Sequence, residues 1–184
     1  VSRDGSQRVS VVEVRNVTGS KLPTGFPSRR LWLRFTISEG SGKSVFASGV
    51  LAPGPQPHHT RISRPDQVQV FESETVDTSG ARTISLLKAV RHSKDNRILP
   101  AGFRPSRFPG LDIAPQGVGG DPGFQPGSAK TTYCIRLPQG PVRVRVQAVF
   151  QTVNPLHLPP ESKNLLPLTR EFIAAEASAA WPSN

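Results

Sequence analysis

The sequence predicts an all-β fold, an antiparallel β-sandwich of the immunoglobulin-like type with long loops and a C-terminal α-helix. Two observations favour the β class. Valine-rich runs alternate apolar with polar residues, and the segments between them are rich in turn residues, with 19 prolines and 16 glycines in 184 residues. A chain of this length can bury one core, so we expect a sandwich domain over residues 1–167 and a helix with a tail over 168–184.

The first half of the chain contains two strongly β-patterned runs. Residues 8–17 carry apolar side chains on both phases of the alternation, which predicts a strand buried on both faces or a bulge. In the run 30–37 one phase is wholly apolar, which is typical of a half-buried strand. That phase consists of Leu31, Leu33, Phe35 and Ile37, and the opposite phase of Arg30, Trp32, Arg34 and Thr36. A loop at 39–43 predicts a hairpin with a further strand at 44–51.

The second half predicts a strand at 67–76, a strand or short helix at 83–91, and a last hairpin formed by 131–137 and 141–153. In the final strand alternate residues are expected to face the core: Val142, Val144, Val146, Ala148 and Phe150. From residue 168 onward, Leu168, Phe172, Ala175 and Ala179 recur at helical spacing, which predicts the terminal amphipathic helix.

Three polar or irregular segments are interpreted as loops. The proline-rich stretch 53–65 cannot be a central strand, because proline removes ladder donors. The mixed charges of 92–103 could form a local network of Lys94, Asp95 and Arg97, but a charge run in a loop is expected to be solvated. The carboxylates of Glu72 and Glu74 are also expected to be solvated, which leaves no pair placed for acid–base catalysis. The stretch 104–128 is too long for a simple connection and is expected to be functional or to wrap the sandwich.

The charge of the chain predicts an acidic partner. The formal net charge is +10 and the pI is about 11.0. The basic residues are scattered singly or in pairs without a nucleic-acid-binding signature, so a nucleic-acid partner is not expected. No apolar run approaches the roughly 20 residues of a membrane span. Because the sequence begins Val-Ser-Arg-Asp without methionine, we expect a processed product or a fragment of a longer protein.

The cysteine and histidine content limits which cofactors the chain can bind. With Cys134 as its single cysteine, the chain can form neither an intrachain disulfide nor a CxxCH haem attachment, so no covalently bound cofactor is expected. Arg136 on the same strand phase would lower the pKa of the Cys134 thiol, but a semi-buried structural cysteine is favoured. His58, His59 and His92 are candidate metal ligands, although two adjacent imidazoles alone make a weak site.

Three separated motifs carry a resemblance to a known family. They are N-x-T-G-x-K-L-P-T-G-F-P-S-R-R-L-W-L from Asn16, F-E-S-E from Phe71, and S-L-L-K-A-V-R-H-S-K-D-N-R-I-L-P-A-G-F from Ser85. Together they resemble the haem-free C-terminal β-sandwich domain of periplasmic or extracellular multihaem c-type cytochromes, and the likeness covers most of the chain. A neighbouring likeness is to methanotroph surface copper proteins.

The resemblance implies a β-sandwich that follows a haem-bearing region rich in CxxCH. This chain departs from that pattern, because it contains no CxxCH and has Ser20 and Arg34 where relatives often carry histidine. The missing histidine in Trp32-Leu33-Arg34 weakens the copper interpretation. The haem-bearing part is therefore missing from this sequence, lies on another chain, or was never present, and a partner chain could hold the haem.

The expected function is a non-catalytic accessory or structural module that associates with a multihaem c-type cytochrome, or with other subunits of the same assembly, in the periplasm or outside the cell. No enzymatic constellation is apparent. The expected docking face is basic, because arginines could meet haem propionates and an acidic protein surface. That face comprises Arg30, Trp32, Arg34, Arg143 and Arg145, with Trp32 either as an anchor or packed inside. The alternative is a surface copper- or metal-binding protein that uses the three histidines.

Overall fold

The computed structural model describes residues 7–24, 26–111, 113–137, 140–155, 158 and 167–181. These residues are almost entirely β-strand and loop, with short 3-10 segments at 167–169 and at η1 (Pro105–Arg107). The strands are β1 (Gln7–Arg15), β2 (Arg30–Glu39), β3 (Ser44–Ser48), β4 (Arg61–Ile62), β5 (Val70–Phe71), β6 (Ser73–Val76), β7 (Arg82–Thr83), β8 (Arg91–Asp95), β9 (Phe124–Gln125), β10 (Ser128–Arg136), β11 (Val142–Gln151) and β12 (Glu171–Trp181). Within the described ranges no helix has the length and apolar character needed to cross a bilayer.

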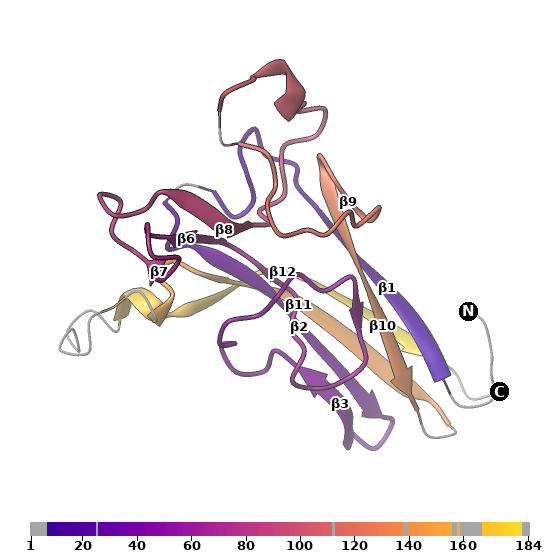
Figure 1. The fold of residues 1–184 in the computed structure, drawn as a ribbon. Helices are drawn as coiled ribbons and strands as arrows, with labels where there is room; N and C mark the ends of the chain where they lie inside the picture. Colours follow the sequence, from indigo (N-terminus) through magenta and orange to yellow (C-terminus); the bar gives the residue numbers. More distant parts are fainter. Residues whose placement is uncertain are drawn as a thin grey trace.

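The strands form three sheets, and their pairing is antiparallel except between β4 and β10. The first sheet has the order β1-β10-β4, with β9 also paired to β10. The second has the order β12-β11-β2-β3, with β5 also paired to β2. The third and smallest has the order β7-β6-β8. Figure 1 shows β1 and β10 at one side of the molecule and β6, β7 and β8 at the other.

The main core lies between the first two sheets. Phe35 of β2 stacks on Tyr133 of β10 with ring centroids 3.8 Å apart, and both side chains are fully buried. The cluster around this pair draws its other members from both layers: Ile37, Phe46, Ile62, Ile135, Val142 and Val144. The alternation of β2 therefore faces the core as predicted. The prediction of a mainly antiparallel all-β fold is confirmed, whereas the immunoglobulin-like strand order stays a prediction.

The predicted final hairpin is wrong, although both of its strands exist. β10 pairs with β1 and β4, whereas β11 pairs with β2 and β12. The physical reason is visible in the core, where Tyr133 and Ile135 of β10 share one cluster with Val142 and Val144 of β11. Each strand contributes to the core from its own sheet, so the two consecutive strands belong to opposite layers and are not paired side by side.

The predicted C-terminal helix is also wrong, because residues 171–181 form strand β12. This segment pairs antiparallel with β11 along its whole length, from Glu171 opposite Gln151 to Trp181 opposite Val142. Alanine is common at helical positions but is small enough for either structure, and the free edge of β11 supplies a ladder of backbone hydrogen bonds. Tertiary pairing thus outweighs local propensity, and the described part of 168–184 adds a strand to the second sheet.

Two other predicted segments are divided between sheets. The strand expected at 67–76 is interrupted at Glu72, so that β5 joins the second sheet and β6 the third. The segment 83–91 becomes a turn between β7 and β8, with the N–H groups of Lys88 and Ala89 both donating to the carbonyl of Ser85 at 3.0 and 2.9 Å. The polar stretch that begins at 92 is not a loop at its start, because β8 covers residues 91–95.

Candidate functional site

The two N-terminal members of the expected basic face are buried, which corrects the prediction that they form an outer surface. Arg30 is 2% exposed, and Trp32 is completely buried. The Arg30 guanidinium donates from Nε to Gln151 Oε1 at 2.7 Å and from Nη1 to the carbonyl of Pro53 at 2.7 Å. Burial lowers the pKa of Arg30, with the opposing charges of Glu72 and Glu171 raising it. Trp32 donates from Nε1 to the carbonyl of Gly49 at 3.0 Å, and its ring lies beneath the Arg30 guanidinium.

The other three arginines differ in how much charge they leave for a partner. Arg34 pairs with Glu171 of β12 at 2.7 Å, and Arg145 pairs with Glu176 through two contacts of 2.9 and 2.8 Å. This pairing raises the pKa of Arg145 and lowers that of Glu176. Arg143 is exposed and has no ion-pair partner within the described ranges. The β12 carboxylates thus neutralise much of the predicted face.

The three candidate metal-binding histidines lie in separate hydrogen-bond environments. His58 is buried, and its Nδ1 accepts from the amide groups of Gln69 at 2.9 Å and Asn96 at 3.2 Å. Its Nε2 therefore carries the proton and donates to Asp121 Oδ2 at 2.9 Å. Both ring nitrogens of His58 are occupied by protein groups.

The other two histidines are not gathered around His58 as ligands. His59 contacts Gln56 Oε1 through Nε2 at 3.0 Å, and burial, followed by the charge of Lys94, lowers its pKa. His92 Nδ1 contacts the hydroxyl of Ser73 at 3.0 Å. Among the residues that the structure describes, no three His, Cys, Asp or Glu side chains are arranged to hold a metal ion. Cys134 is buried in β10, in the same part of the fold as the main core.

The charged stretch that follows His92 is buried, contrary to the prediction that it is solvated. Lys94, Asp95 and Asn96 are each at most 6% exposed. Lys94 Nζ donates to Glu72 Oε1 at 3.0 Å and to the carbonyl of Gln56 at 2.8 Å. Asn96 accepts from the N–H of Glu72 at 2.9 Å and donates to the carbonyl of Val70 at 2.7 Å. This network joins the segment 56–72 to β8 inside the molecule, and the expectation that Glu72 is solvated is wrong.

Asp95 is the second charged centre of this region. It pairs with Lys21 Nζ at 2.6 Å and with Arg97 through contacts of 2.8 and 2.7 Å. Burial by itself would raise the pKa of Asp95, but the hydrogen bonds and charges of Arg97 and Lys21 outweigh it and hold the pKa below its ordinary value of 3.8. Through Lys21, this centre fastens the loop before β2 to the end of β8.

The variant Asp95→Asn is expected to lose about 1.5–3 kcal/mol of stability at neutral pH, because two cations lose a charged acceptor. Since the pKa of Asp95 is lower in the folded than in the unfolded protein, the unfolded state binds more protons near pH 4. The stabilisation is thus complete above that pH and disappears as the pH falls through the folded-state pKa. Urea unfolding between pH 2.5 and 7 measures it. An Asp95→Asn protein that loses as much stability in acid as the wild type would contradict this account.

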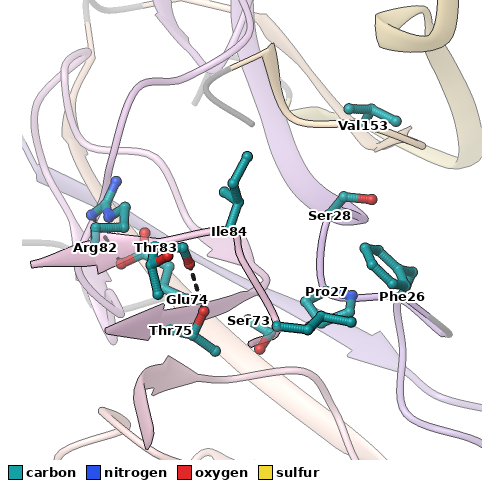
Figure 2. Close-up of a pocket in the computed structure, with 11 residues that line it drawn as sticks. Phe26, Pro27, Ser28, Ser73, Glu74, Thr75, Arg82, Thr83, Ile84 and Val153 are labelled. Carbon is teal, nitrogen blue, oxygen red and sulfur yellow. Dashed lines mark hydrogen bonds and ion pairs between the residues drawn. The ribbon is translucent and has the colours of Figure 1, made fainter. Parts of the chain in front are cut away.

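An open pocket of about 320 Å³ lies between the third sheet and the loop before β2. Its lining is mixed, with apolar side chains from three segments and a charged pair from the sheet. Figure 2 shows Glu74 and Arg82 at one end of the pocket and Phe26 and Val153 at the other. The remaining lining residues are Pro27, Ser28, Ser73, Thr75, Thr83, Ile84 and Leu86.

The charged pair of the pocket is internally satisfied. Arg82 Nη2 donates to Glu74 Oε2 at 2.9 Å. Burial raises the pKa of Glu74, the charge of Glu72 adds to the increase, and Arg82 opposes it. Ser73 lines the same pocket, and its hydroxyl contacts His92 Nδ1 at 3.0 Å.

The apolar part of this surface was not identified from the sequence. Phe26 and Ile84 are about half exposed, and Leu86 and its neighbour Leu87 are more exposed still. One signal was available, since two adjacent leucines stand in the otherwise polar context Thr-Ile-Ser-Leu-Leu-Lys. Periodicity alone cannot reveal it, because it says which residues share a face but not whether another layer covers that face.

Comparisons with known proteins give one informative match. No family model matches the chain, and no curated protein is similar to it. Among solved structures, the chain is similar to a penta-haem cytochrome c552 from Thermochromatium tepidum, with a TM-score of 0.61 and 17% identity. The match covers 98% of this chain and 37% of that chain, so this chain spans little more than a third of the cytochrome's length. At this identity the likeness is one of fold.

Proposed function

We propose that this chain is a non-catalytic β-sandwich module that associates with a multihaem c-type cytochrome outside the cytoplasm. The observation that carries the proposal is the fold likeness, because nearly the whole chain matches about a third of a penta-haem cytochrome. The resemblance of the motifs at Asn16, Phe71 and Ser85 points to the same class of protein.

The cysteine content places any covalently bound haem outside these 184 residues. Covalent attachment through CxxCH requires two cysteines, and this chain has only Cys134, which is buried. The module would therefore act through its surface, as a cap or docking unit for a haem-bearing chain. Its net charge of +10 favours an acidic partner surface, which haem propionates and carboxylate side chains would provide.

Capture from the source organism tests this proposal. The tagged full chain is expected to retain a protein with covalently bound haem from an extracytoplasmic extract, detected by haem staining and a Soret band in the eluate. The intact mass of the captured module itself should equal that of the bare 19.9 kDa polypeptide. An eluate that contains no covalent haem at low ionic strength, where charge attraction is strongest, would overturn the proposal.

A further inference from the structure

One region of the surface combines large exposed apolar side chains from two segments. We call it the apolar patch and define it as Phe26, Ile84, Leu86, Leu87 and Val90, each at least 49% exposed, with Leu87 at 99%. Three of its members line the pocket described above, and Figure 2 shows Phe26 and Ile84 there. Grouped exposed apolar side chains next to a pocket are typical of a protein-binding surface, since each square ångström left in water costs about 25 cal/mol.

The backbone holds this apolar patch in a fixed shape. The turn that carries Leu86 and Leu87 is closed by the N–H of Lys88 on the carbonyl of Ser85 at 3.0 Å. Beyond it, the N–H of Val90 donates to the carbonyl of Val76 at 3.0 Å, and before it Thr75 Oγ1 donates to the carbonyl of Thr83 at 2.6 Å. Both ends of the turn are therefore tied to β6. A rigid display of leucines loses little entropy when a partner binds.

Cations belong to the same two segments. We call Arg29, Lys88 and Arg91 the basic rim, because Arg29 follows the pocket loop while Lys88 and Arg91 flank Val90. None of them forms an ion pair with a carboxylate in the part of the chain that the structure describes, in contrast to Arg34, Arg82 and Arg145. A complementary partner would have an apolar centre bordered by carboxylates.

We infer that the apolar patch with its basic rim is the surface that seats the haem-bearing chain. This inference rests on the proposed function and replaces the face built on Arg30 and Trp32. The exposed edge of a c-type haem has the required chemistry, because its apolar macrocycle carries two anionic propionate groups. The apolar centre would meet Leu86 and Leu87, and Lys88 and Arg91 would approach the carboxylates.

Leu87→Asp tests the apolar patch, and Leu51→Asp is its matched control. Both leucines are highly exposed, at 99% and 83%, and neither substitution disturbs the core. Leu87 adjoins the pocket-lining Leu86, whereas Leu51 follows β3 and lies outside the segments that form the apolar patch. The probe is the haem protein recovered by the wild-type module, immobilised for binding measurements with purified variants. Leu87→Asp is expected to raise the Kd at least about tenfold, and Leu51→Asp to leave it unchanged.

A charge-reversal pair tests the basic rim in the same assay. The double variant Lys88→Glu/Arg91→Glu is expected to weaken binding strongly at low salt and less at high salt, because screening reduces the attraction that it removes. Arg143→Glu, at an exposed position of β11, reverses one charge outside the rim and should have little effect.

The possible outcomes separate this inference from the proposed function. If the wild type captures a haem protein and Leu87→Asp binds it equally well, the proposed function stands and the apolar patch is not the docking surface. If the wild type captures no haem protein, both the proposed function and the inference about the apolar patch fail. Sedimentation of the purified chain adds a further readout, since self-association abolished by Leu87→Asp would assign the patch to a second copy of this chain and overturn the haem-bearing partner.

Discussion

Replacing Lys94 with methionine is expected to lower the free energy of unfolding by about 3–5 kcal/mol, the usual cost of breaking a buried ion pair by removing one partner. Lys94 and Glu72 are both buried, and their charged atoms are 3.0 Å apart. Methionine fills a similar volume but leaves the Glu72 carboxylate without its cation and the carbonyl of Gln56 without a donor. Urea unfolding followed by tryptophan fluorescence measures the difference.

The control for this prediction is the double variant Lys94→Met/Glu72→Gln. Removing both charges avoids an isolated buried carboxylate, so the double variant is expected to recover much of the stability lost by Lys94→Met. Lys88→Met reports the effect of the same substitution at an exposed site and should be nearly neutral. A loss below about 1 kcal/mol for Lys94→Met would show that water reaches Glu72.

Trp32→Ala is expected to cost about 3–5 kcal/mol, as large-to-small changes of core aromatics do. The indole fills the space between Val68, Val70 and Val149, and its N–H satisfies the carbonyl of Gly49. Gly49 itself has a φ of +67°, and a Cβ there would lie 2.5 Å from the carbonyl oxygen of Leu33, so the position whose carbonyl accepts from Trp32 requires glycine.

Trp32→Phe separates packing from binding at this position. It keeps most of the apolar volume and loses the hydrogen bond, so it should destabilise less than alanine and stay folded in a docking assay. Because Trp32 is completely buried, we expect its affinity for the haem-bearing partner to equal that of the wild type. If folded Trp32→Phe binds the haem-bearing partner more weakly than the wild type, Trp32 contributes to the interface.

The fold class could be predicted from local patterns, but the pairing of strands could not. The alternation of Leu31, Leu33, Phe35 and Ile37 is a property of the strand itself, and it is found in β2 as expected. Whether β11 pairs with β10 or with β2 depends on contacts between residues more than a hundred positions apart. A local sequence pattern contains no information about such contacts. The alanine-rich segment of β12 has no strong preference of its own, so its neighbour decides its structure.

At the candidate site, the main incorrect prediction was that the charged residues are solvated. Charged residues such as Lys94 and Asp95 are usually solvated, and only long-range partners such as Glu72 and Lys21 make their burial possible. The reverse holds for Leu87, an apolar residue that no second layer covers. Of the arginines predicted to meet a partner, Arg30 is buried, whereas Arg143 is exposed.

The pairing of β1 with β10 has a consequence for the order in which the molecule can assemble. Arg15 lies opposite Ser128 and Gln7 opposite Arg136, so β1 pairs with a strand that is synthesised more than a hundred residues later. At about 5–20 residues per second, that interval lasts several seconds or longer. Pairing between strands so far apart in sequence predicts slow refolding. It also predicts that the valine-rich β1 of the nascent chain needs protection until β10 appears.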